Sequence, residues 1–482
     1  MEEIDSLGVF WLPGRDEDQL SGRLQFDPIE GIDLVLVGEF ESRLRSGEPI
    51  PQIVGWIESK QVTLDNCYFR GAHRRYPGVI ESRFHANRLF VGHQFSQQEL
   101  AFKSATVELA YLENWVNRSG INDEQMHAFG HASPYEIHFT PLAAETQAFT
   151  RGEITLGFSW RYNGDPIAGI TLKQRPFFRI DYDELVEFDK IRKDVGRIQD
   201  LMTLCVDTPV NVDRFVLRRP DLHTMMLSGQ DSGEEQEIEF RAPVLRYNPP
   251  EQRKTRHYHQ MFLSFDEIGG LQGVASWIEN SARFQRALDS LMSTKHVERM
   301  YAENRFLNIT YAAEAFHRIT RGGSLMPEEE FSELLGQYVE VTPEERQIWL
   351  LDRLRYANDY SLPKRLRKLA IEAKIVTKPL IGSEGRWANT IAGVRNKLTH
   401  LPGDEESFRG GDLYFLAESV YAVMRVCMLL EAGISREVLA SKKGSEPVSW
   451  HMDRVASAME RVRARMQNSE GLGTPDKAAE LS

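Results

Sequence analysis

The sequence contains little cysteine. Its 482 residues include three cysteines, which are widely separated and form no Cys-x-x-Cys pair. An odd and sparse set of this kind supports neither a disulfide framework nor a zinc site. We therefore expect reduced thiols and a cytoplasmic protein; the three residues are Cys67, Cys205 and Cys427.

Long hydrophobic runs are also absent. A membrane-spanning helix needs about 20 apolar residues, and the most apolar long segment, 413–430, is interrupted by Glu418 and Arg425. The first five residues are acidic and lack the basic and apolar regions of a signal peptide. We expect no membrane partner, and we expect residues 413–430 to form a core helix of a bundle.

Positive charge is in deficit over the whole chain. Lysine and arginine together number 58, against 71 aspartates and glutamates, which gives a formal net charge of −13. Such a chain does not coat nucleic acid over its whole surface, so any contact with a polyanion must be local.

Motifs for metals and cofactors are missing as well. The sequence has no phosphate-binding glycine-rich loop, no His-Glu-x-x-His and no Gly-x-Ser-x-Gly. His127, His131 and His138 lie close together, but Gly130 and Pro134 break the regularity and no carboxylate arrangement accompanies them. We expect neither a metal site nor a cofactor.

The chain is too long for one typical core, and two or three domains are expected. Residues 1–180 carry short runs rich in Val, Ile, Phe and Tyr between turn residues, which predicts a β-rich, sandwich-like domain. Residues 181–263 read as a mixed helix and strand extension of that region. Residues 264–440 show helical periodicity, and 441–482 form a polar, partly disordered tail. The fold class is α+β, with the β-rich region followed by an all-α bundle.

One segment reverses the charge of the chain. Residues 361–400 hold nine basic residues against two acidic ones, a local charge of +7. A confined positive field in an acidic protein predicts a polyanion site, although such runs are as often only a solvated helix face. The predicted RNA contacts are Lys364, Arg365, Arg367, Lys368, Arg386 and Lys397.

The segment ends in an arginine five residues before a histidine, Arg395 and His400. The spacing alone means little, because the pairs Arg88/His93 and Arg218/His223 share it. Five residues of ideal helix turn the chain by about 500°, so the two side chains lie about 140° apart. Leu401-Pro402-Gly403 predicts a helix end or distortion that brings His400 back, and Ser383 is the predicted cap at the helix start.

These residue types suit cleavage of RNA without a metal. The 2′-hydroxyl attacks the adjacent phosphate, which requires a base, an acid and positive charge on the phosphate. Histidine transfers protons near neutral pH, and arginine binds phosphate with two parallel hydrogen bonds. Asn396 is positioned to orient the histidine or to bind a phosphate oxygen. Since one motif supplies one histidine, a homodimer with two facing motifs completes the acid and base pair.

Three further residues, Glu314, His317 and Arg318, are spaced to share one helix face. They form either a surface ion-pair cluster or a set of groups that supports the catalytic residues from the first bundle helix.

The pattern Arg395-Asn396-x-x-x-His400 in a helical bundle resembles the HEPN superfamily. The segment from Ala312-Ala313-Glu314 to Asn396 resembles the HEPN domain of ApeA-type anti-phage proteins. The opening Gly8-Val9-Phe10-Trp11-Leu12-Pro13-Gly14, with the strands after it, resembles the N-terminal domain of that family. The resemblance implies a metal-independent, 2′,3′-cyclic phosphate-forming ribonuclease, dimeric through the HEPN helices, that acts in abortive infection.

On this resemblance Arg395 and His400 are catalytic, Asn396 assists, and the β-rich region senses a phage-derived trigger. Two alternatives stay open. The helical domain is a non-catalytic RNA-binding or assembly module, or the β-rich domain is the main functional unit and binds a protein or carbohydrate.

Overall fold

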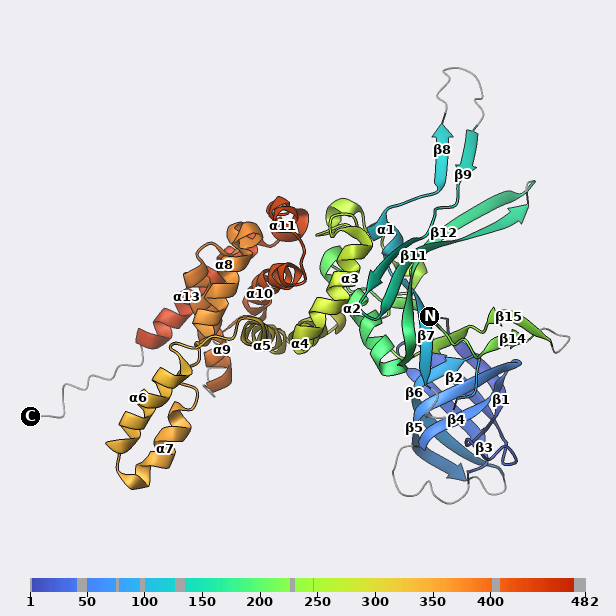
Figure 1. The fold of residues 1–482 in the computed structure, drawn as a ribbon, viewed down its shortest axis with the longest axis horizontal. Coiled ribbons are helices and arrows are strands. Elements are labelled where there is room, and N and C mark those ends of the chain that lie inside the picture. The colour runs from blue at the N-terminus through green and yellow to red at the C-terminus, as the bar shows by residue number, and fades with distance from the viewer. Residues whose placement is uncertain are drawn as a thin grey trace, which may run out of the picture. The chain divides into compact units, whose positions relative to one another are not determined.

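The computed structural model describes residues 2–40, 50–74, 78–95, 100–125, 135–165, 167–225, 230–245, 247–400 and 408–471. The chain divides into two compact units, Met1–Glu279 and Asn280–Ser482 (Figure 1). The division falls later than the boundary at residue 264 that we expected. The reason is helix α3 (Gly270–Ser281), whose Trp277 is fully buried and donates a hydrogen bond to the Arg197 carbonyl at 2.8 Å.

The first six strands close into an antiparallel barrel in the order β1-β2-β3-β6-β5-β4, with β4 pairing back to β1. Alternate side chains point inward and form one apolar core that includes Phe10, Leu24, Leu34 and Phe84. The β-rich prediction is confirmed, but the strands close on themselves where we expected two stacked sheets. The barrel strands are β1 (Ile4–Trp11), β2 (Leu20–Asp27), β3 (Gly31–Val37), β4 (Ile50–Ile57), β5 (Lys60–Arg74) and β6 (Ile80–Val91).

The sheet continues beyond the barrel through β16, a third partner of β6, in the order β6-β16-β13-β7-β12-β11-β10. Helix α2 (Phe188–Val206) packs on β7 and β12, and the Phe188 ring contacts the Phe240 ring in a tilted arrangement with ring centroids 4.6 Å apart. The mixed segment 181–263 thus belongs to the β-rich unit. Its other elements are β7 (Ala101–Leu109), α1 (Leu112–Val116), β10 (Glu145–Phe149), β11 (Gly152–Asp165), β12 (Gly169–Glu187), β13 (Val212–Arg218), β16 (Ile238–Arg241) and the two-stranded pairs β8 (Ile121–Gln125) with β9 (Tyr135–Phe139) and β14 (His223–Met225) with β15 (Asp231–Glu235).

The second unit is helical throughout its described residues. Ten α-helices follow one another in it: α4 (Gln285–His296), α5 (Ala302–Arg321), α6 (Glu328–Glu340), α7 (Glu344–Leu354), α8 (Leu362–Ile381), α9 (Glu384–His400), α10 (Gly410–Glu431), α11 (Arg436–Ser441), α12 (Glu446–Ser449) and α13 (Met452–Gly471).

Helix α10 is the core of this unit. By length and composition it could span a membrane, yet 83% of its most apolar window is buried in the structure. Every residue from Leu416 to Leu429 is buried, because α5, α8 and α13 pack around it. A helix that is apolar on all sides forms the centre of a bundle, as the sequence predicted.

Two cations hold Glu418, a carboxylate buried in the middle of α10. The Glu418 side chain is 6% exposed, lies 3.2 Å from Lys295 Nζ of α4 and accepts a hydrogen bond from Arg305 of α5. Burial raises the pKa of Glu418, but the two cations outweigh it and hold the pKa below its usual value. This ion triad fixes α4 and α5 against α10.

The polar tail contributes to the bundle. Helix α13 packs on α8, α9 and α10, and its Val455, Ala458 and Val462 are fully buried. Part of the segment 441–482, expected to be a polar and partly disordered tail, therefore supplies part of the core. Residues 472–482, which we expected to be disordered, lie outside the described residues.

The ion triad yields a stability prediction. Replacing Glu418 with Gln leaves two partly buried cations without a counter-charge, which costs about 3 kcal/mol of unfolding free energy. Urea denaturation followed by helical circular dichroism measures the loss. The matched control is Glu460→Gln on the exposed face of α13, for which the change stays within about 0.5 kcal/mol. Equal effects in the two variants would contradict the role of the triad.

Candidate active site on helices α8 and α9

Helix α9 carries the predicted catalytic residues. Ser383 Oγ accepts a hydrogen bond from Arg386 N at 3.5 Å, which confirms the predicted cap. Glu384 in the first turn lies 2.9 Å from Lys378 Nζ, and that hydrogen bond lowers the pKa of Glu384. The start of α9 is therefore fixed to the end of α8.

The inner face of α9 is apolar. Trp387, Ile391 and Val394 follow at steps of four and three residues and are fully buried against the bundle. Trp387 Nε1 donates a hydrogen bond to Ser419 Oγ of α10 at 2.9 Å. This contact sets the rotation of α9 and hence the direction of the residues near its end.

Arg395 lies beside the buried face and is itself half-buried. Its Nη1 donates a hydrogen bond to Asn396 Oδ1 at 3.3 Å, and Asn396 is exposed. Thr399 Oγ1 donates to the Arg395 carbonyl at 2.9 Å, which keeps this turn helical. In the described residues Arg395 forms no ion pair.

The helix is continuous through His400. The predicted end or distortion between Arg395 and His400 is wrong, because every residue between them is helical. The two positions therefore point about 140° apart. The proposed helix stop, Leu401-Pro402-Gly403, lies outside the described residues.

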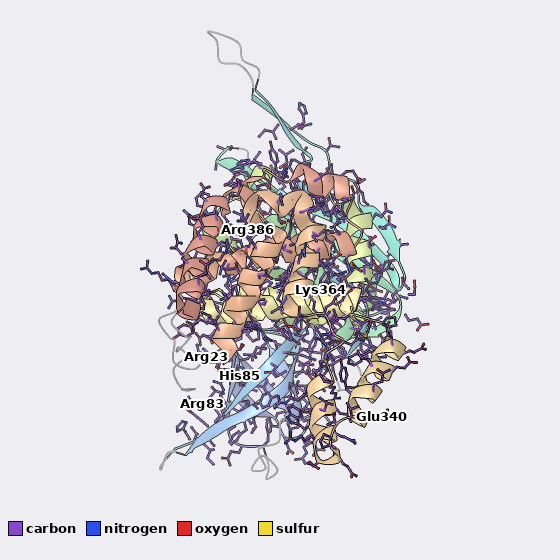
Figure 2. The ribbon with its side chains drawn as sticks, turned by 90° about the vertical axis from the view of Figure 1, so that its left-hand side faces the viewer. Arg23, Arg83, His85, Glu340, Lys364 and Arg386 are labelled. Carbon is purple, nitrogen blue, oxygen red and sulfur yellow. The ribbon has the colours of Figure 1, made fainter. Side chains whose placement is uncertain are left out.

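A row of cations covers the outer face of α8. Lys364, Arg367, Lys374 and Lys378 recur at the spacing of one helix face, with Ile371 between them. Arg367, Lys368, Lys374, Lys378 and, on α9, Arg386 are exposed. Lys364 is half-buried, and its Nζ lies 3.8 Å from the centroid of the Tyr360 ring. Figure 2 shows Lys364 and Arg386 on the side of the helical unit that faces the viewer.

The prediction that Arg365 contacts RNA is wrong. Its side chain is 1% exposed, and its guanidinium donates to the Gly322 carbonyl at 2.6 Å and to the Tyr360 carbonyl at 2.9 Å. The buried Leu369 lies four positions after Arg365, so the helical period places Arg365 on the same inner face of α8. It joins α8 to the end of α5 and does not reach a ligand.

His317 is buried against Arg365. Arg365 Nη1 lies 3.2 Å from His317 Nδ1, so Nδ1 accepts and the proton is on Nε2. Nε2 is buried and has no hydrogen-bond partner in the described part of the chain. Desolvation, followed by the charges of Arg365 and Lys368, lowers the pKa of His317 to about 4. His317 is therefore a neutral core residue, and its described polar contact is with Arg365.

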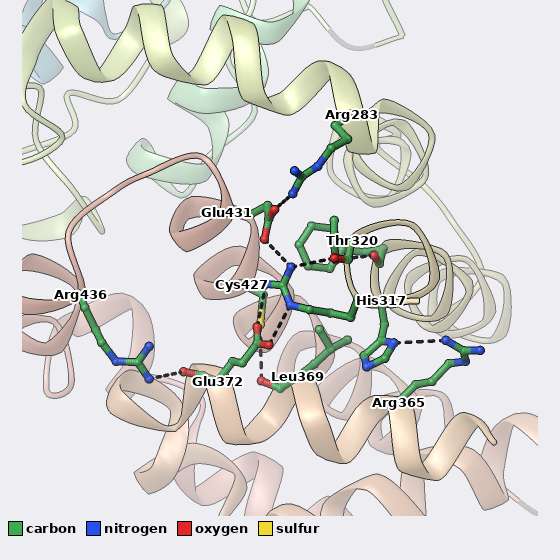
Figure 3. Close-up of polar contacts among 11 residues, drawn as sticks. Arg283, His317, Thr320, Arg365, Leu369, Glu372, Cys427, Glu431 and Arg436 are labelled. Carbon is green, nitrogen blue, oxygen red and sulfur yellow. Dashed lines mark hydrogen bonds and ion pairs between the residues drawn. The ribbon is translucent and has the colours of Figure 1, made fainter. Parts of the chain in front are cut away.

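The neighbours of His317 form the ion-pair cluster that was one of the two predicted interpretations. Arg318 lies 3.5 Å from Glu314 and 2.9 Å from Asp359. One turn later, Arg321 binds Glu372 of α8 at 2.9 Å and Glu431 of α10 at 2.5 Å. Figure 3 shows the Glu372 and Glu431 contacts meeting between α5, α8 and α10. The cluster holds together the helices that present the cations.

Two parts of the site were not predicted. The Trp387–Ser419 contact joins separate helices and leaves no local pattern in the sequence. The Tyr360 ring beneath Lys364 is different, because Tyr360 lies four residues before Lys364 and this spacing is visible in the sequence. Lys397 is half-buried and already takes part in an interaction within the protein. Across the described ranges, no three His, Cys, Asp or Glu side chains are grouped to hold a metal; His127 and His131 lie outside those ranges.

His317 predicts a dependence of stability on pH. Its folded pKa of about 4 is below the ordinary 6.5, so between these values the unfolded chain binds more protons. The free energy of unfolding then falls by about 2 kcal/mol from pH 7 to pH 5. His317→Gln removes this contribution and flattens the profile, whereas His73→Gln on the surface does not. Parallel profiles for the wild type and His317→Gln, measured by urea denaturation, would refute the assignment.

Two known protein families match this chain, one over each of its two units. Residues 5–277 match the family described as ApeA N-terminal domain 1, and residues 307–438 match the family described as Apea-like HEPN. No curated protein and no solved structure matches the chain. The first match covers the β-rich unit and the second covers α8, α9 and α10. The chain therefore belongs to the ApeA family and carries a HEPN domain after its ApeA N-terminal domain.

Proposed function

We propose that this protein is a metal-independent endoribonuclease of anti-phage defence, cytoplasmic and acting by abortive infection. The observation that carries the proposal is the coincidence of three features in one HEPN domain. Arg395 has no ion-pair partner in the described residues, His400 closes the same helix, and exposed cations cover the adjacent face of α8.

The chemistry divides between the side chains. Exposed Arg367, Lys368, Lys374 and Arg386 bind the RNA backbone as point charges or forks. Arg395 stabilises the charge that develops on the pentavalent phosphate, and Asn396 holds its guanidinium through the 3.3 Å contact. His400 transfers the proton of the attacking 2′-hydroxyl or of the leaving 5′-oxygen.

The angle between positions 395 and 400 supports a two-chain centre. In α9 these positions lie about 140° apart around the helix axis, so a phosphate at Arg395 is on a different side of the helix from position 400. A second copy brings its own His400 to that phosphate, and a pair of chains supplies both the acid and the base. We therefore propose a homodimer as the cleaving species.

The β-rich unit is proposed to control the nuclease by binding a phage-derived trigger. A hollow of about 390 Å³ on the barrel supports this assignment, because it presents polar groups of both signs. Arg70, His73 and Arg83 line it together with Asp33, and Arg70 lies 3.8 Å from Asp33.

The catalytic assignment predicts the outcome of two substitutions. Arg395→Ala and His400→Ala each lower the rate of RNA cleavage at least about 100-fold while the fold and the dimer persist. Cleavage by the wild type continues in EDTA and leaves 2′,3′-cyclic phosphate ends. The matched control is His223→Ala, which shares the Arg-x4-His spacing on the β-rich unit and retains activity. Full cleavage and phage restriction by His400→Ala would end the nuclease proposal, and RNA binding without products would favour the binding module.

The RNA-binding face predicts a salt dependence. Arg367→Ala and Lys374→Ala each remove one phosphate contact, so the slope of log affinity against log salt falls by about 0.7 per variant for single-stranded RNA. Fluorescence anisotropy with labelled RNA from 50 to 300 mM salt measures the slope, a range of about sixfold in salt. Lys443→Ala, exposed after α11, is the control and leaves the slope unchanged. Unchanged slopes in all three variants would place the RNA elsewhere.

A further inference from the structure

The hairpin formed by α6 and α7 lacks a core of its own. Among its described residues, from Glu328 to Leu354, none is buried. Phe331, Leu334 and Leu350 are half-buried. Helices of 13 and 11 residues are marginal in water without tertiary packing. The hairpin is therefore built to gain stability from a partner.

An apolar surface remains open on the hairpin. Ile348 is 82% exposed, Val341 81%, Trp349 58% and Tyr338 53%. Exposed apolar side chains scattered singly need no explanation, but a contiguous group on one small element marks an interaction surface. Trp and Tyr are also the residues that contribute most to protein interfaces.

The charge of the hairpin identifies the chemistry of its partner. Residues 328–354 contain eight carboxylates and two arginines, a net charge of −6. Glu330, Glu333 and Glu340 recur on one face of α6. The surface that complements this combination is a helix face with both cations and an exposed apolar residue. The outer face of α8 is such a surface, because Ile371 is 42% exposed among the cations.

Hydrogen bonds at the two ends of the α6–α7 hairpin fix its direction relative to the α8 helix of its own chain. Asn358 is 6% exposed and accepts hydrogen bonds from the backbone N–H groups of Leu325 and Met326 at 3.1 and 3.0 Å. Its Nδ2 donates to the Met326 carbonyl at 3.1 Å. This clamp ties the segment before α6 to the segment after α7. Figure 1 shows α6 and α7 projecting from the bundle. The partner is therefore a second chain.

We propose that the α6–α7 hairpin of one copy docks on the cationic face of α8 in a second copy, and that this contact covers the RNA-binding face. The contact is reciprocal in a two-fold pair, since each chain carries both surfaces. Regulation of RNA binding by this contact rests on the proposed function; the docking itself does not. Acidic side chains occupy the positions of phosphates, so the docked pair is inactive.

Two consequences follow from this arrangement. RNA and the hairpin compete for the same cations, so one chain cannot hold both. Release of the hairpins frees α8 and allows two chains to bring Arg395 and His400 to one phosphate.

Disulfide trapping between differently tagged copies tests the docking. One full-length copy carries Glu333→Cys and the other Lys374→Cys; all three native cysteines are buried and do not interfere. The expected result is a crosslink between the two tags, about tenfold above the control pair of Glu333→Cys with Ser457→Cys on exposed α13. Adding Ile348→Ser and Trp349→Ser to the hairpin copy reduces the crosslink about tenfold. These two positions are exposed, so the fold is retained.

The outcomes separate the two proposals. A crosslink at the control level, or one confined within single chains, overturns the docking whatever the RNA assays give. A specific crosslink between copies supports the docking, and a rise in RNA affinity of the Ile348→Ser, Trp349→Ser variant supports its inhibitory role. A specific crosslink combined with RNA binding that ignores Arg367→Ala supports the docking and contradicts the proposed RNA face.

Discussion

The helical unit depends on one buried carboxylate and its two cations. Glu418 lies in the middle of a mostly apolar, buried helix, and Lys295 and Arg305 fix α4 and α5 against it. An apolar helix alone can rotate or slide among similar neighbours at small cost, whereas a buried charge accepts one register. Helices α5, α8 and α13 pack on α10, and α9 is joined to it through the Trp387–Ser419 hydrogen bond. The chemistry of the surface is thus set from the centre of the bundle.

Local pattern predicted the elements, and long-range pairing decided their arrangement. The alternation of apolar residues and the turn residues predicted a β-rich region, and the three- and four-residue steps predicted α2, α5 and α10. Closure of the barrel depends on β4 pairing with β1 and β5 with β6, which is a matter of register between distant strands. The alternation in each strand is the same in a barrel and in a sandwich, so the sequence does not distinguish the two.

The sequence composition predicted where the cations of the candidate site lie. It did not predict in which direction each side chain points from its helix. The excess of cations in 361–400 identified the α8 face, and Arg367, Lys368 and Arg386 are exposed as expected. Arg365 belongs to the same basic run, but the helical period turns it inward to the carbonyl groups at the end of α5. Charge counts along a sequence ignore that period. The divergence of Arg395 and His400 likewise followed from helix geometry once the helix proved continuous.

The burial of α10 also affects the order in which the two units fold during synthesis. The β-rich unit is complete at residue 279, whereas the core of the helical unit requires residues 410–431. Helices α5, α8 and α9 emerge from the ribosome before the helix that their apolar faces contact, and chains fold from the N-terminus as they are made. The cation face and Arg395 therefore reach their final positions only after the N-terminal unit has folded. A chain that is still being translated carries its proposed regulatory unit before it carries the proposed nuclease surface.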